Sequence, residues 1–150
     1  LFRLLERSLG TLLAILVSSA LFSAVHLLNP HADLLSTFQL LVLGLLFIAA
    51  FLYTRRLWLC IGLHWGWNYA QGGLFSSPVS GTKAEGFFQS TMTGPAWLTG
   101  GDFGIEASVL ASGGALICTV LLLKAARQQH WVLPFWQRAT VSETKTATTD

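Results

Sequence analysis

Long apolar runs alternate with short polar stretches along most of the chain. The apolar runs predict four membrane-spanning helices, at residues 9–28, 34–53, 57–75 and 105–123. The run at 34–53 carries no charged residue over 20 positions, and about 20 apolar residues are needed to cross the hydrocarbon core of a bilayer. Residues 76–104 are rich in Gly, Ser, Thr and Pro and are predicted to form a loop. The pattern predicts an all-α fold, a polytopic transmembrane helix bundle.

Composition agrees with a lipid environment. Hydrophobic residues make up 53% of the 150 residues and charged residues only 11%, whereas soluble domains have about 25% charged residues. The formal net charge of +2 comes without a basic run, so we expect the lipid bilayer as a partner and no nucleic acid. We interpret residues 1–136 as one transmembrane domain and the polar, Thr-rich residues 137–150 as a disordered tail.

The basic residues are distributed unevenly about the four predicted spans. If the spans alternate in direction, eight of the nine Lys and Arg residues lie on one side of the membrane and only Lys83 lies on the other. An excess of Lys and Arg marks the cytoplasmic side of a membrane protein. We therefore predict a multi-pass protein of the cell membrane with both ends of this sequence in the cytoplasm.

A few polar side chains interrupt the predicted spans. Phe22 and His26 are one helical turn apart, His64 and Asn68 have the same spacing, and Gln71 continues the second stripe. Polar groups in hydrocarbon are costly unless they face a partner or a water-filled cavity. A hydrogen bond to a neighbouring helix would explain any one of them, but together they favour a shared pocket. An imidazole can act as a general base or ligate a metal, and an Asn can stabilise an oxyanion.

Geometry sets a condition on that pocket. From the predicted span limits, His26 and His64 differ in depth by roughly 10 Å, at 1.5 Å of rise per residue. The two histidines meet only if the first span starts later, if Asn29-Pro30 breaks its helix inside the membrane, or if a helix tilts. Asp33, which follows this dipeptide, is predicted to cap the second span. Glu6 is interpreted as an interfacial charge balanced by a neighbouring arginine.

The order Phe22-x-x-x-His26 and then His64-x-x-x-Asn68 resembles the second and third motifs of the CPBP family. This family comprises CAAX prenyl-protease-like and bacteriocin-processing membrane proteases. Supporting stretches are residues 1–6, 24–30 and 99–106, and the resemblance runs from Leu1 to about Gly114. The family's first motif, Glu-Glu-x-x-x-Arg, is absent, and we expect it upstream of Leu1.

The resemblance implies an intramembrane endopeptidase acting on a peptide or protein substrate within the membrane. His26 would be the water-binding base partner, His64 and Asn68 would position water or stabilise the oxyanion, and Phe22 and Gln71 would shape the pocket. Two histidines and a glutamate could instead hold zinc, with His26 and His64 as ligands, but a metal-free mechanism explains Asn68 more naturally. Without the glutamates we expect these residues alone to be inactive. The alternative is a non-catalytic membrane interaction or bacteriocin self-immunity protein on the same scaffold.

Glu106 matches a recurrent family feature in the stretch Gly-Gly-x-Phe-Gly-x-Glu. We interpret it as a structural cap at the start of the fourth span.

Overall fold

The computed structural model describes residues 1–128, so the predicted tail at 137–150 lies outside the described residues. Within residues 1–128 the chain is helical, and its β-type pairing is a single bridge between Val79 and Thr82. The elements in order are α1 (Phe2–Leu9), α2 (Thr11–Val25), η1 (His26–Leu28), α3 (Leu34–Thr54), α4 (Trp58–Asn68), η2 (Tyr69–Leu74), α5 (Ala96–Thr99), η3 (Gly101–Phe103), η4 (Ile105–Ala107) and α6 (Val109–Gln128). The all-α helical bundle predicted from the sequence is confirmed.

Three helical segments among the described residues are long and apolar enough to cross a membrane: α2 with η1, α3, and α6. The fourth predicted span, at 57–75, is not among these three and stays a prediction. That segment forms the 11-residue α4, and at Tyr69 it changes to the six-residue π-helical η2. Each of these two helices is shorter than the other three segments, and His64, Asn68 and Gln71 make this part of the chain more polar.

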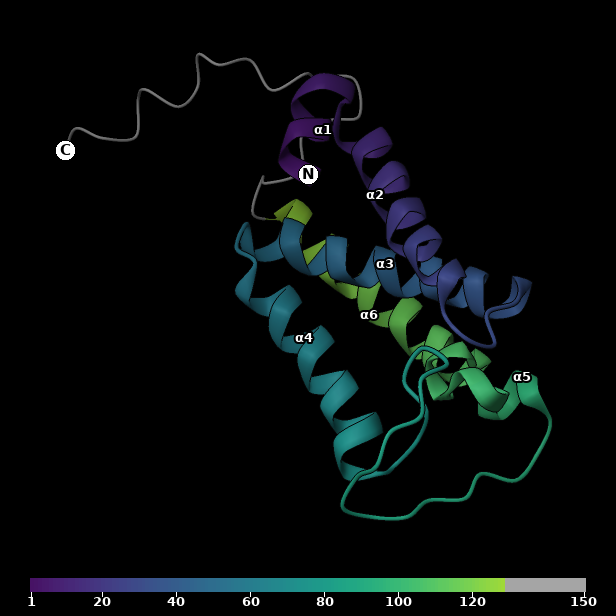
Figure 1. The fold of residues 1–150 in the computed structure, drawn as a ribbon. Coiled ribbons are helices and arrows are strands. Elements are labelled where there is room, and N and C mark those ends of the chain that lie inside the picture. The colour runs from purple at the N-terminus through teal and green to yellow at the C-terminus, as the bar shows by residue number, and fades with distance from the viewer. Residues whose placement is uncertain (129–150) are drawn as a thin grey trace.

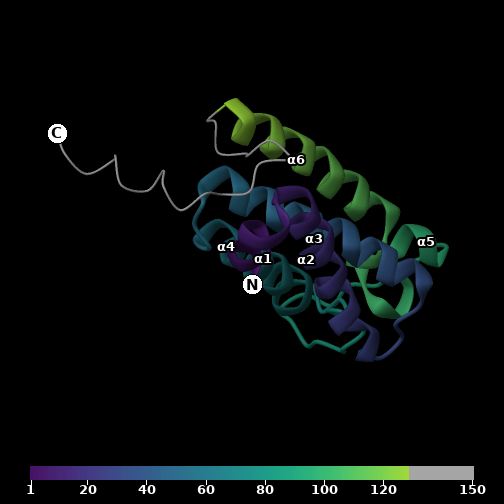
Figure 2. The same ribbon diagram turned by 90° about the horizontal axis from the view of Figure 1, so that it is seen from above.

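Helix α3 is the centre of the bundle and lies between α2 and α6 (Figures 1 and 2). Half of its apolar window is buried, compared with 22% for each of the other two spans. The buried core combines side chains of α3 with residues from η3, η4 and α6: Leu40, Val42, Leu43, Phe103, Ala107 and Ala115. Outward-facing side chains such as Leu16 and Ile117 remain more than half exposed. Such extensive apolar surface is suited to contact with lipid.

Local sequence features set the helix boundaries. Gly10 has φ of 82° and separates α1 from α2, a conformation that Gly adopts without steric cost. Asp33 accepts a hydrogen bond from the Ser36 backbone N–H at 2.7 Å, and the Ser36 hydroxyl oxygen accepts one from the Asp33 N–H. This reciprocal arrangement confirms Asp33 as the N-cap of α3.

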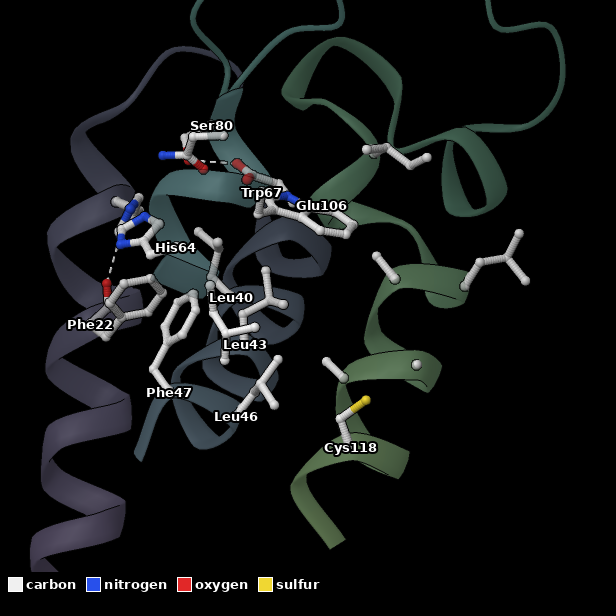
Figure 3. A pocket seen from close by; sticks show the side chains of 18 residues that line it. Phe22, Leu40, Leu43, Leu46, Phe47, His64, Trp67, Ser80, Glu106 and Cys118 are labelled. Carbon is white, nitrogen blue, oxygen red and sulfur yellow. Dashed lines mark hydrogen bonds between the residues drawn. The ribbon is translucent and has the colours of Figure 1, made fainter. Parts of the chain in front are cut away.

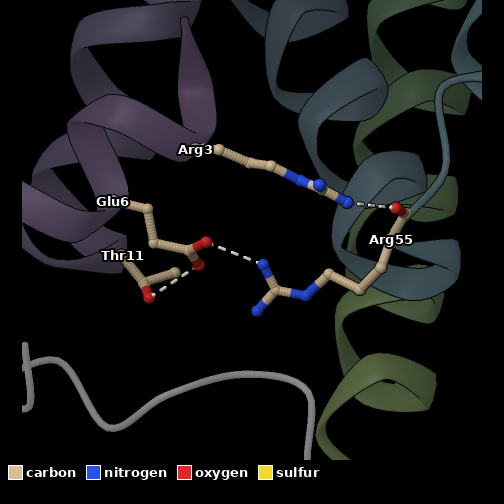
Figure 4. Close-up of polar contacts among 4 residues, drawn as sticks. All are labelled: Arg3, Glu6, Thr11 and Arg55. Carbon is tan, nitrogen blue, oxygen red and sulfur yellow. Dashed lines mark hydrogen bonds and ion pairs between the residues drawn. The ribbon is translucent and has the colours of Figure 1, made fainter. Parts of the chain in front are cut away.

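A buried ion pair joins α1 to the C-terminal end of α3 (Figure 4). Glu6 is 6% exposed, and its carboxylate lies 2.7 Å from the Arg55 guanidinium. Thr11 donates a hydrogen bond to the same carboxylate at 3.1 Å, and Arg3 donates to the Arg55 backbone carbonyl at 2.9 Å. Glu6 is therefore not a surface charge balanced by a nearby arginine of its own helix. It pairs across the fold and fixes α1 against α3.

Candidate functional site

A cavity of 420 Å³ lies among α2, α3, α4 and the beginning of α6. Its polar lining comes from His26, His64, Asn68, Ser80 and Glu106, and most of its other lining residues are apolar. In Figure 3, His64, Ser80 and Glu106 lie at one end of the cavity, while Leu46 and Cys118 lie toward the other. The cavity therefore has a polar end and an apolar end.

His26 is placed by the way α2 ends. The backbone N–H of His26 bonds to the Ser23 carbonyl as the chain tightens into the 3₁₀ turn η1. The Phe22 carbonyl, one turn back, instead accepts a hydrogen bond from His26 Nδ1 at 2.6 Å. Because a carbonyl oxygen can only accept, the proton lies on Nδ1. A neutral His26 ring therefore has an unprotonated Nε2, the nitrogen needed to accept a proton or hold a water.

The aromatic ring of Phe22 connects the two histidines. Its centroid lies 4.7 Å from that of His26 and 5.7 Å from that of His64, and Phe47 stacks on His64 at 5.0 Å. The predicted difference in depth does not keep the histidines apart. Helix α2 begins at Thr11, later than predicted, so one of the conditions set from the sequence holds. Its α-helical part ends at Val25, before Asn29-Pro30.

Asn68 lies one turn after His64, at the last residue of α4, and lines the same cavity. Gln71, predicted to continue this stripe, is not among the lining residues. It is 5% exposed, and its Nε2 donates a hydrogen bond to the Pro78 carbonyl. The physical reason is η2, because a π-helical turn contains extra backbone and rotates the following residues away from the α-helical face. Gln71 instead anchors the start of the long loop.

Glu106 and Ser80 are site residues that the sequence interpretation missed. The Ser80 hydroxyl donates a hydrogen bond to the Glu106 carboxylate, and Trp67 lies beside it (Figure 3). Glu106 is 3% exposed and precedes the span that begins at Val109. Burial raises the pKa of its carboxyl, and the hydrogen bonds from Ser80 act in the opposite direction.

The interpretation of Glu106 as the cap of the last span is corrected by the structure. The Ser108 hydroxyl oxygen accepts a hydrogen bond from the Ala111 backbone N–H at 3.1 Å. Ser108 directly precedes α6 and thus occupies the N-cap position. The Glu106 side chain points into the cavity (Figure 3).

The described donor groups do not complete a zinc site. Catalytic zinc sites use three protein ligands and one open position. Among residues 1–128 no group of three or more His, Cys, Asp and Glu side chains is arranged to hold a metal ion. His26 and His64 alone do not meet this requirement.

Fold and cavity together define a helical membrane protein with two histidines and an asparagine at one polar pocket. Residues 1–70 match the family described as type II CAAX prenyl endopeptidase, Rce1-like. The match covers Phe22, His26, His64 and Asn68, and it confirms the resemblance found in the motifs. The matched residues are fewer than half of the 150, and the match supports an assignment to the CAAX protease (CPBP) family, which suggests protease activity in general. No curated protein and no solved structure matches the chain.

Proposed function

We propose that this chain forms the histidine-bearing part of an intramembrane endopeptidase that hydrolyses peptide bonds with an activated water. The observation that carries the proposal is the hydrogen bond from His26 Nδ1 to the Phe22 carbonyl. It leaves Nε2 as the basic atom of a ring that shares a cavity with His64 and Asn68. A base and an amide donor at one polar pocket are two of the parts that peptide hydrolysis needs.

In the proposed reaction a water held at His26 Nε2 loses a proton to that nitrogen as its oxygen attacks the carbonyl carbon. The glutamates expected upstream of Leu1 would assist this proton transfer, as the family resemblance implies. The Asn68 amide and His64 would stabilise the negative charge that develops on the carbonyl oxygen. The carbon–nitrogen bond then breaks as the leaving nitrogen takes up the proton removed from the water, or an equivalent one held in the pocket. Phe22 holds both rings in place through its contacts with them.

The positions of the basic groups support a cell-membrane protein with both ends of this sequence in the cytoplasm. Arg3 and Arg55 lie together where α1 meets the end of α3. The C-terminal end of α6, which carries Lys124 and Arg127, lies at the same end of the bundle in Figure 1. By the positive-inside rule this end faces the cytoplasm. We propose a peptide or protein within the membrane as the substrate.

The test reconstitutes this sequence, joined to a segment that carries the family's Glu-Glu-x-x-x-Arg motif, in liposomes with quenched fluorescent peptides of apolar sequence. We expect His26→Ala and His64→Ala each to lower the cleavage rate by at least about 10²-fold, the usual contribution of a general base or acid. His31→Ala is the matched control, because His31 is exposed and lies outside the cavity. Unfolding in detergent, followed by circular dichroism, checks that each variant retains the wild-type fold.

The alternative is a non-catalytic interaction or bacteriocin self-immunity protein on the same scaffold. It predicts that the wild type binds the peptides without cleaving them and that His26→Ala binds them equally well. Cleavage by the wild type that persists unchanged in both histidine variants would instead overturn the proposed roles of His26 and His64.

A further inference from the structure

A buried carboxyl group in a membrane protein requires an explanation. Glu106 is 3% exposed and lies in a cavity whose lining is mostly apolar. Burying an ionisable group is costly, so a buried carboxyl group in a cavity is a candidate for a functional role. Capping does not account for it, because Ser108 occupies that position.

Burial raises the pKa of the Glu106 carboxyl and so favours the neutral acid, while the hydrogen bonds from Ser80 and Trp67 and the charge of His26 act in the opposite direction. The Ser80 hydroxyl donates its hydrogen bond to Oε1. An apolar site keeps a carboxylic acid protonated, and in that form it can donate.

The same cavity also carries the base. His26 comes from the end of α2, whereas Glu106 comes from η4, and the two side chains line the same cavity and interact electrostatically. The other titratable groups that line this cavity among the described residues are His64 and Cys118. A base and an acid on separate elements of one cavity can act on opposite sides of a peptide bond placed between them.

We propose that Glu106 is the general acid of the site and gives its carboxyl proton to the nitrogen of the leaving amine. This inference rests on the proposed function. The proton of the attacking water goes to His26 Nε2, the carbon–nitrogen bond breaks as Glu106 protonates the nitrogen, and the products are a carboxylic acid and an amine. The proton on His26 then returns to Glu106 through the emptied cavity, so that both groups regain their starting states.

The leaving group provides the test. An amine must be protonated to leave, whereas a nitrophenolate leaves without a proton. Wild type and Glu106→Gln are compared on a peptide amide and on the nitrophenyl ester of the same acyl group, in liposomes. We expect Glu106→Gln to lower kcat/KM for the amide by about 10²–10⁴-fold, the usual contribution of a general acid, and to leave that for the ester close to the wild-type value.

Two controls separate acid catalysis from structure. Ser80→Ala removes the hydrogen bond but keeps the carboxyl group, so amide cleavage should fall far less than in Glu106→Gln. Glu85→Gln removes an exposed carboxyl of the loop and should change neither rate. Circular dichroism melts verify that Glu106→Gln is folded, and retention of ester cleavage gives a second check.

The outcomes distinguish the two proposals. Equal loss of amide and ester cleavage in Glu106→Gln, or no loss of either, overturns the general-acid role while leaving the proposed function intact. Absence of His26-dependent cleavage of either substrate by the wild type overturns the proposed function and this inference with it.

Discussion

The first two spans approach each other closely at Gly44, in the middle of α3. A Cβ atom added at Gly44 would lie 3.2 Å from the Ser19 Cα and 3.3 Å from the Ser19 carbonyl oxygen. It would also lie 3.3 Å from Cδ1 of Phe22. Backbone atoms cannot rotate away as a side chain can, so α2 itself must move. Gly62 in α4 is the matched control, because a Cβ atom added there would have nothing within 4 Å.

The magnitude follows from two opposing effects. Replacing Gly by Ala in a helix gains about 1 kcal/mol from helix propensity. Over-packing an interface costs about 1–3 kcal/mol, and at Gly44 a few tenths of an ångström of separation must be found. Propensity is common to both sites and cancels in their comparison. We therefore expect Gly44→Ala to be less stable than Gly62→Ala by about 1–3 kcal/mol. The difference in stability should be larger between Gly44→Leu and Gly62→Leu.

The measurement is the free energy of unfolding in mixed detergent micelles, followed by far-ultraviolet circular dichroism. Gly44→Leu should also slow peptide cleavage, because the Phe22 ring that touches the new side chain holds both histidines. Equal stabilities of the Gly44 and Gly62 variants would refute the reasoning. That result would mean that α2 and α3 are not held at the close approach seen here.

Two further predictions concern polar groups at the helix ends. Asp33→Ala removes the acceptor used by the Ser36 backbone N–H and should lower the unfolding free energy by about 0.5–2 kcal/mol in the same assay. That hydrogen bond holds the pKa of Asp33 below its ordinary value, so its stabilisation is present above the pKa of the unfolded carboxyl and is lost as pH falls through the folded value. Below about pH 4 the wild type should lose stability. If the unfolding free energy of Asp33→Asn fell as steeply with falling pH, that would contradict the prediction. Glu6→Gln and Arg55→Gln should each cost about 1–3 kcal/mol, less than a fully buried pair because the Arg55 side chain is 26% exposed. The double variant Glu6→Gln/Arg55→Gln should lose less unfolding free energy than the two single variants lose together. Strict additivity of the two losses would argue against the pairing.

The apolar pattern was sufficient to predict most of the helices. The span predicted at 34–53 is α3 at Leu34–Thr54, and Asp33 caps it as expected. Both follow from local chemistry, namely a long uncharged run and a carboxylate at its first turn. The pairing of Glu6 with Arg55 could not be predicted in the same way. It joins positions 49 residues apart, and sequence spacing gives no information on a contact made only by folding.

The loop that brings Ser80 to Glu106 explains why the polar end of the cavity was incomplete in the sequence. The π-helical η2 turns Gln71 toward Pro78, so the loop starts by folding back over the end of α4. The backbone at residue 104 can approach Pro78 and Gln71 this closely only because residue 104 is a glycine. A Cβ atom added there would lie 2.0 Å from the Pro78 carbonyl oxygen and 2.5 Å from Gln71 Nε2. Gly104 has φ of 110°, which L side chains rarely adopt. A change of helix type and one glycine thus place Ser80 against Glu106, and neither is visible in an apolar pattern. Residue types predicted the histidine side of the site, whereas its carboxyl side depends on backbone geometry that only the folded chain displays.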